Sequence, residues 1–124
     1  MKEYRVIIAG SREFSDYEKL KENCDRILQE KLEDEDSHVI IVSGHARGAD
    51  TLGEQYAMER CLDLDAHPAD WKQYGRAAGM IRNREMANVA NALIACPQVG
   101  VENKGTQNMV MLARKKQLDV FVVE

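Results

Sequence analysis

The chain has 124 residues, of which 44% are hydrophobic and 31% charged, a balance typical of one globular domain with its own core. No apolar run approaches the roughly 20 residues of a membrane-spanning helix, and the first residues lack the pattern of a signal peptide, so we expect a cytoplasmic protein. The net charge of -4 argues against a general attraction to nucleic acid, and three widely spaced cysteines argue against a disulfide framework or a zinc site.

The first predicted element is a strand over 4–9, rich in Val and Ile, which stops at a Gly-Ser-Arg loop at 10–12. Ser15 and Glu18 then fit a capping box, in which the serine is the N-cap of a helix. Apolar residues recur at helical spacing from 17 to 31, so this helix is expected to pack one face on the core.

The central feature is the segment 39–50, Val-Ile-Ile-Val-Ser-Gly-His-Ala-Arg-Gly-Ala-Asp. Its apolar run without alternation predicts a strand covered on both faces, as in a parallel sheet. Gly44 and Gly48 let the backbone approach a ligand, and the helix that follows offers unpaired N–H groups to an anion. Arg47 adds a guanidinium group suited to a phosphate. The alternative is that the glycines form a tight turn, the arginine is solvated and Asp50 is the helix N-cap.

Small residues four apart at Ala49, Gly53 and Ala57 predict a helix that lies close against the sheet. The segment 62–67 follows as a third strand. It is short and polar, so we expect it at an edge of the sheet, closed by Pro68.

The segment 69–86 has poor amphipathic order. Trp71 and Tyr74 lie beside Arg76, which favours an aromatic and cationic wall for a base and its phosphate, whereas a tryptophan that anchors a loop is the structural alternative. Clear helical periodicity returns at Met86, and 92–96 is the fourth strand.

Two further elements complete the predicted fold. A loop over 99–106 ends in Lys-Gly-Thr and precedes a helix, with Thr106 as N-cap and with room for a phosphate at the helix start. The last strand covers 119–123 and is expected to be buried.

Five strands that alternate with four helical segments predict a single α/β domain over 1–124, with a doubly wound parallel five-stranded sheet and helices on both faces. If the strand order is 3-2-1-4-5, ligands bind at the switch point between the first and fourth strands, where the loops at 10–12, 44–50 and 104–106 meet. Acidic residues concentrate over 13–36 and basic residues over 72–84. A local basic pocket on an acidic protein suits a small anion better than a polymer.

Six motifs together resemble the YspA-like branch of the SLOG superfamily, over essentially the whole chain. They are Gly-Ser-Arg at 10–12, Ser-Gly-His-Ala-Arg-Gly-Ala-Asp at 43–50, Ala-Asp-Trp at 69–71, Gly-Arg-Ala-Ala-Gly at 75–79, Arg-Asn-Arg-Glu-Met at 82–86 and Gly-Thr at 105–106. The superfamily is named after Smf/DprA and the LOG enzymes, and the resemblance implies a Rossmann-like domain with a site for nucleotides or nucleotide-derived ligands. LOG enzymes cleave the bond between base and ribose 5'-monophosphate. Met109 stands where their catalytic glutamate falls, so the resemblance favours binding over this hydrolysis.

Three hypotheses for function follow. The first is binding or sensing of a nucleotide-derived phosphorylated ligand at the carboxyl ends of the strands. The second is a LOG-like hydrolase for the N-glycosidic bond of a nucleoside monophosphate, with Asp50 or Glu85 as the catalytic carboxylate. The third is single-stranded nucleic-acid binding, with Trp71 and Tyr74 stacking on bases, against which the net acidity weighs.

The predicted ligand-binding residues share the glycine-marked loops, the helix starts and the basic segment. They are Gly10, Ser11, Arg12, Gly44, Arg47, Gly48, Ala49, Asp50, Trp71, Arg76, Arg82, Asn83, Lys104, Gly105 and Thr106. No metal site or cofactor is indicated, because the three histidines, His38, His45 and His67, lack ligand spacing. Ser43, His45 and Asp50 are too close in sequence to predict a catalytic triad. Self-association is a hypothesis by analogy with relatives that pair through helices.

Overall fold

A computed structural model of the protein describes residues 2–124. The strands are β1 (Lys2–Gly10), β2 (Ser37–Ser43), β3 (Asp63–Ala66), β4 (Ala92–Cys96) and β5 (Asp119–Val122). The helices are α1 (Tyr17–Glu33), α2 (Ala49–Glu59), α3 (Trp71–Tyr74), α4 (Ala78–Val89) and α5 (Lys104–Lys115), and a single 3-10 turn (Gly75–Ala77) joins α3 to α4.

The five strands form one sheet in the order β3-β2-β1-β4-β5, and every pair of neighbours is parallel. Val6 in the middle of β1 pairs with Ile41 of β2 on one side and with Ala92 of β4 on the other. The chain therefore reverses its direction across the sheet between β1 and β4. This confirms the α/β fold class and strand order predicted from the sequence.

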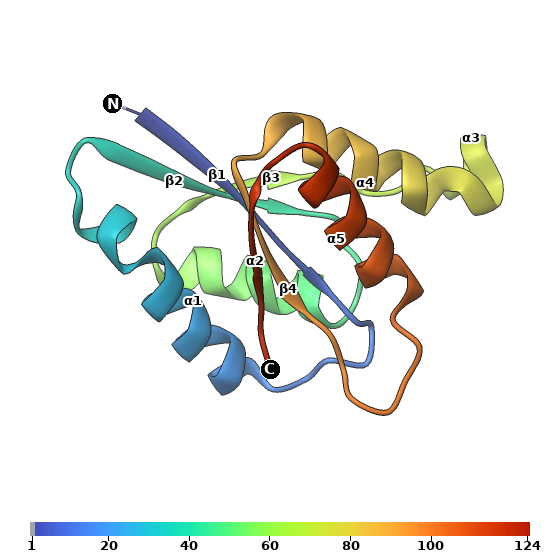
Figure 1. The fold of residues 1–124 in the computed structure, drawn as a ribbon, viewed down its shortest axis with the longest axis horizontal. Coiled ribbons are helices and arrows are strands. Elements are labelled where there is room, and N and C mark those ends of the chain that lie inside the picture. Colours follow the sequence, from blue (N-terminus) through green and yellow to red (C-terminus); the bar gives the residue numbers. More distant parts are fainter. Residues whose placement is uncertain (1) are drawn as a thin grey trace.

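Helices cover both faces of the sheet, with α1 and α2 on one side and α4 and α5 on the other (Figure 1). Each face has its own buried apolar cluster, and alternate residues of β1 enter each one. Val6 and Ile8 pack with α1 and α2, whereas Ile7 packs with α4 and α5. A strand that is apolar on both sides is what a parallel sheet between two helical layers requires.

The small-residue face of α2 lies directly on the sheet, as predicted. A Cβ added to Gly53 would lie 2.8 Å from the Cβ of Ile8, so only glycine allows this separation between the helix and β1. Cys24 and Cys96 are buried in the apolar interior, whereas Cys61 is exposed.

The helix caps predicted for α1 and α5 are wrong. The N-cap of α1 is Asp16, whose carboxylate accepts a hydrogen bond from the N–H of Lys19, and the preceding Ser15 has no such role. Two adjacent residues could each serve as a cap, and the sequence does not distinguish them. The N-cap of α5 is Asn103, so Thr106 is the third residue inside the helix.

Two further predictions need correction. β5 is an edge strand that pairs with β4 alone, and its Phe121 and Val122 are partly exposed, so it is not the buried strand that its β-branched sequence suggested. α4 begins at Ala78, well before the periodicity that returns at Met86. The early turns of α4 carry Arg82 and Asn83, which serve a polar site described below and so interrupt the apolar pattern.

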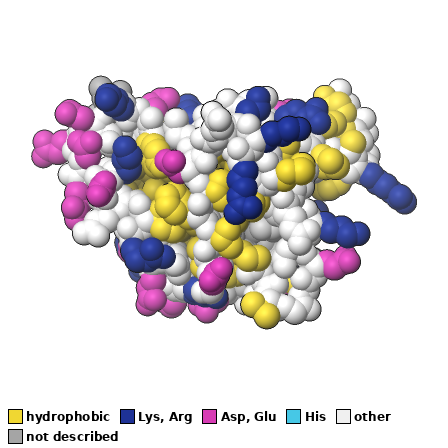
Figure 2. All heavy atoms as spheres, in the orientation of Figure 1, with side chains coloured by type: hydrophobic (Ala, Val, Ile, Leu, Met, Phe, Trp, Pro, Cys, Tyr) yellow, Lys and Arg dark blue, Asp and Glu magenta, His cyan; other side chains and the backbone are white. Residues whose placement is uncertain are grey.

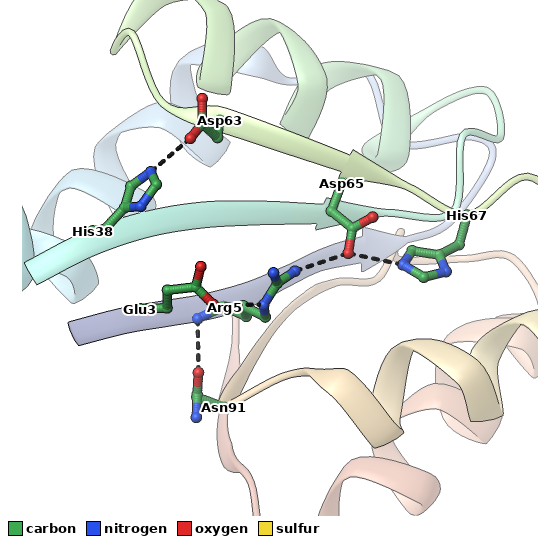
Figure 3. Close-up of polar contacts among 7 residues, drawn as sticks. All are labelled: Glu3, Arg5, His38, Asp63, Asp65, His67 and Asn91. Atoms are coloured by element: carbon green, nitrogen blue, oxygen red, sulfur yellow. Dashed lines mark hydrogen bonds and ion pairs between the residues drawn. The ribbon is translucent and has the colours of Figure 1, made fainter. Parts of the chain in front are cut away.

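The β3 edge is polar, as predicted, and its side chains bond to side chains of β2 and β1 (Figure 3). Asp63 lies 2.6 Å from the imidazole of His38, and Asp65 accepts hydrogen bonds from Arg5 and His67 at 3.0 Å each. These contacts give His38 and His67 structural roles at the edge of the sheet.

Charge is distributed unevenly over the surface. Figure 2 shows Asp and Glu side chains gathered over the end of α1 and the start of β2, and Lys and Arg side chains on the half that carries α3 and α4. Within residues 2–124, no helix combines the length and the apolar character needed to cross a membrane.

Candidate ligand-binding site

A cavity of about 590 Å³ opens at the carboxyl ends of the strands, beside the switch point between β1 and β4. The loop after β1, the loop after β2, α3, α4 and the start of α5 all contribute to its walls. Twelve of the fifteen residues predicted to bind a ligand line it: Gly10, Ser11, Arg12, Arg47, Asp50, Trp71, Arg76, Arg82, Asn83, Lys104, Gly105 and Thr106.

The loop after β1 is fixed by backbone contacts. Gly10 has no room for a side chain, because a Cβ there would collide with the carbonyl oxygen of Cys96 and would lie 2.9 Å from the Cβ of Ala49. The N–H of Ser11 donates to that same carbonyl of Cys96, and the carbonyl of Ser11 accepts from the N–H of Ala49, both at 3.1 Å. The ends of β1 and β4 and the start of α2 are therefore held together under the cavity.

Asp50 lies in the first turn of α2 and is only 5% exposed. Gly48 is the N-cap of that helix, at φ +82°, so the predicted capping role of Asp50 is wrong. Its carboxylate instead accepts a hydrogen bond from the N–H of Ala46 at 3.2 Å, which fixes the loop after β2. Burial raises the pKa of Asp50 to about 6, against the opposing effects of backbone N–H groups and the Arg82 charge.

Arg82 joins α4 to the loop after β2. Its Nη1 donates to the carbonyl of Gly44 at 2.6 Å, and its Nε donates to Asn83 Oδ1 at 2.9 Å. Burial lowers the pKa of Arg82, and the nearby Asp50 charge opposes this effect. Gly44 itself is confined, since a Cβ there would lie 2.6 Å from Arg82 Nη1 and 2.7 Å from Asp50 Oδ2.

Asn83 connects α4 to the far wall of the cavity. It is 7% exposed, and its Nδ2 donates to Asn108 Oδ1 at 2.9 Å. This bond connects α4 to α5, the two helices that form this wall of the cavity. The position of Arg82, which is bonded to Asn83, therefore depends on both helices.

The start of α5 opens onto the cavity through Lys104, Gly105 and Thr106. The first N–H groups of a helix have no partners within it, and the helix dipole favours a negative charge there. The side chain of the N-cap residue, Asn103, does not bond to these N–H groups, because it is bonded to the backbone of Gln98 and Val101. The α5 start is therefore suited to an anion.

The rim is aromatic and basic. The Arg12 guanidinium lies 5.9 Å from the ring centroid of Trp71, which is half-exposed. Arg47 pairs with Glu13 at 3.1 Å, and both side chains are exposed to solvent. With Arg76, Arg82 and Lys104, the cavity has five cationic side chains against the three carboxylates of Glu13, Asp50 and Glu102.

Comparison with known proteins places this chain in a family. The family model described as "YspA, cpYpsA-related SLOG family" (YAcAr) matches residues 4–74, which is more than half of the chain. The chain belongs to this SLOG family. The match covers the first three strands and α3, whereas Arg82, Asn83 and the start of α5 lie beyond it.

Two individual proteins are similar to this SLOG chain. The Gene 61 protein of Mycobacterium phage D29 is 30% identical over an alignment of 123 residues, which covers 94% of this chain and 94% of the phage protein. DNA processing protein A (DprA) from Streptococcus pneumoniae has a similar structure, with a TM-score of 0.68 and 20% sequence identity. The superposition covers 98% of this chain and 50% of the DprA chain, so this SLOG chain corresponds to half of that protein and shares its fold there.

Four candidates of the SLOG chain do not line the cavity. Three of them come from the loop after β2 and the start of α2. Gly44 lines an adjoining, more open space, and Gly48 allows the loop to approach the carbonyl of Ser11. Ala49 is buried at the start of α2. Glu85 is also outside, because its carboxylate is exposed and lies 3.9 Å from His67 Nδ1.

Several lining residues were missed by sequence reasoning. Asn108 and Met109 follow the Gly-Thr pair by one helical turn, and Gly79 and Met80 precede Arg82 on α4. A helical projection around those motifs would have found them. Among residues 2–124, no cluster of three or more His, Cys, Asp or Glu side chains is arranged to hold a metal ion.

Proposed function

We propose that the cavity binds a nucleotide or nucleotide-derived ligand through its phosphate. The observation that carries this proposal is the convergence of Arg12, Arg82 and the start of α5 on one cavity at the switch point of the sheet. Open parallel sheets bind ligands at this point, and guanidinium groups and helix starts are complementary to phosphate. Membership of the SLOG family supports the same ligand class.

The aromatic rim gives the base a place to stack. Trp71 is 50% exposed and lines the cavity beside Arg12, so a purine can lie against its ring. Charge-assisted hydrogen bonds contribute about 1.5–3 kcal/mol each, so two arginines, a helix start and one stacked base support binding near micromolar Kd. This affinity suits a sensor of a cellular metabolite.

Calorimetry with AMP, ADP, ADP-ribose, NAD and cyclic nucleotides tests the proposal. We expect at least one to bind, and we expect Arg12→Ala to weaken that binding about tenfold or more, because an exposed cation next to the base and phosphate is removed. Arg26→Ala is the matched control, since Arg26 is an exposed arginine on α1 bonded only to Asn23. If no compound in the panel binds, or if both variants behave alike, the proposal is wrong.

A second candidate function is hydrolysis of the N-glycosidic bond at the same site. Asp50 favours it, because a cavity-lining carboxylate with pKa near 6 is suited to accept a proton close to neutral pH. Glu85 is not placed for this role. Incubation of the protein with nucleoside monophosphates, followed by chromatography for free base, distinguishes binding alone from turnover.

Single-stranded DNA belongs in the same panel, because Trp71 and Tyr74 are both exposed. Base stacking on such aromatic residues is how single strands are commonly bound. Tyr74 does not line the cavity, and the net charge of the chain is -4, so we expect a short oligonucleotide to bind more weakly than a mononucleotide. Stronger oligonucleotide binding that falls steeply with salt would favour the nucleic-acid function instead.

A further inference from the structure

A second chamber of about 640 Å³ lies next to the cavity and is more open to solvent. Both spaces share a wall that includes Arg12, Arg47, Arg82 and Trp71. The second chamber also reaches His45, on the loop after β2, which does not line the first cavity. Three guanidinium groups therefore lie between two adjoining spaces, and a histidine lies only on the far side.

His45 is held by a network within its own loop and α2. Its Nδ1 lies 2.8 Å from Glu54 Oε2, and the same oxygen accepts a hydrogen bond from Ser43 Oγ at 2.8 Å. The backbone N–H of His45 donates in turn to Ser43 Oγ at 3.1 Å. Since Nδ1 is engaged by the carboxylate, Nε2 is on the opposite side of the ring and free for a ligand. The side chain is 60% exposed, so a ligand can reach it.

The backbone of His45 is in the left-handed region, at φ +58°, which is uncommon for residues other than glycine and is adopted more often by asparagine, aspartate and histidine than by other residues with a side chain. Within residues 2–124, two other non-glycine residues have positive φ. Cys61 and Gln117 directly follow the C-caps of α2 and α5, where this conformation is common. His45 is at no helix end. A glycine would adopt this conformation more readily, so the backbone of the loop does not require a side chain here and the imidazole is available for a role of its own.

We propose that His45, together with Arg12 and Arg47, forms a second anionic subsite, so that the ligand class is one with two or more linked anionic groups, such as a nucleoside diphosphate. This inference rests on the proposed function, because the first phosphate occupies the first cavity. A protonated imidazole donates from both nitrogens, to Glu54 through Nδ1 and to a phosphate through Nε2. The charged residues that line the second chamber besides His45 are Arg12, Arg47 and Arg82, which also favour an anion. Glu54 and Glu13 contact His45 and Arg47 from outside this lining.

Calorimetric titration of AMP and ADP into the wild-type protein, His45→Gly and His45→Asn tests the subsite. Glycine suits the positive φ, and asparagine is tolerated there with a side chain too short to replace the imidazole, so both variants are expected to fold. We expect ADP to bind the wild-type protein at least about tenfold more tightly than AMP, and we expect both variants to lose this preference while AMP binding is unchanged. A charge-assisted hydrogen bond accounts for a factor of about this size.

His38→Ala is the matched control, because His38 also contacts a carboxylate, Asp63, but at the β3 edge away from both spaces (Figure 3). It should retain the wild-type preference for ADP. The subsite is overturned if His45→Gly prefers ADP as strongly as the wild-type protein does, or if the wild-type protein does not prefer ADP at all. In either case, binding of AMP would still support the proposed function. If the wild-type protein binds neither AMP nor ADP, the subsite is overturned, and failure of the whole nucleotide panel overturns the proposed function too.

Discussion

Asp50 carries the most perturbed carboxyl group of the site, and its position has a consequence for stability. The buried carboxylate fixes the loop after β2 through the N–H of Ala46, yet burial raises its pKa from 3.8 to about 6. The protonated form is therefore favoured in the folded protein relative to the unfolded chain. Since the folded state binds more protons between these two values, this group makes the free energy of unfolding decrease as the pH rises from about 4 to about 6.

We predict that Asp50→Asn removes this part of the pH dependence. A shift of about two pKa units corresponds to roughly 3 kcal/mol, so the wild-type protein should lose up to that amount relative to the variant between pH 4 and pH 7. Urea unfolding of both proteins at several pH values measures the difference. Parallel stability curves over this range would show that the carboxyl group titrates normally.

Only some of the other residues of the site could be predicted from the sequence. Gly10, Arg12 and Gly105 stand next to predicted strand ends or helix starts, so their positions follow from the order of elements. Glu54 could not be recognised as the partner of His45, because it is one of several acidic residues on a helix and its role depends on the orientation of that helix against β2. A sequence shows which residues can form a pair and does not show which ones do.

The close contact between α2 and β1 allows a prediction about the stability of the protein. Alanine in place of a glycine inside a helix usually stabilises it by about 1 kcal/mol. At Gly53 the added Cβ would lie 2.8 Å from both Cβ and Cγ2 of the buried Ile8, and such overpacking costs about 1–3 kcal/mol. We therefore expect Gly53→Ala to reduce the free energy of unfolding by up to about 2 kcal/mol, measured by urea denaturation.

Gly105→Ala is the control for this effect, since Gly105 is also helical and nothing lies within 4 Å of a Cβ built there. It should leave the stability unchanged or raise it slightly. If both alanine variants are equally stable, α2 shifts away from the sheet more easily than the packing implies.

Element boundaries show where sequence reasoning succeeds and where it fails. The strands β1, β2 and β4 were located well, because uninterrupted apolar runs that end near glycine leave few alternatives. The cap of α1 was misplaced by one residue, because the adjacent Ser15 and Asp16 can each accept from the same N–H groups. The cap of α5 was misplaced by three residues, because the helix begins after Asn103, whose side chain is bonded to the preceding loop and not to the helix. α4 was seen only in its second half, since its first turns serve the cavity.

The order of the strands in the sheet determines where the cavity lies and which strands are the least stable. The order β3-β2-β1-β4-β5 brings the loops after β1 and β2 and the start of α5 to one side of the molecule, although they are far apart along the chain. The same order leaves β3 and β5 with one neighbour each. Each of these edge strands has four residues, and most of their side chains are exposed or only partly buried.

Hydrogen exchange should therefore divide the sheet into a slow centre and fast edges. The central strand β1 pairs on both sides, and the side chains from Val6 to Ile8 are fully buried, so we expect the amides of β1 and β4 to exchange only through global unfolding. Amides of β5 pair on one side alone and should exchange at least about tenfold faster through local opening. Exchange followed by mass spectrometry at increasing urea measures both classes, since only global opening depends strongly on urea. Equal protection of β5 and β1 would mean that the edge is covered by a second molecule or opens only together with the core.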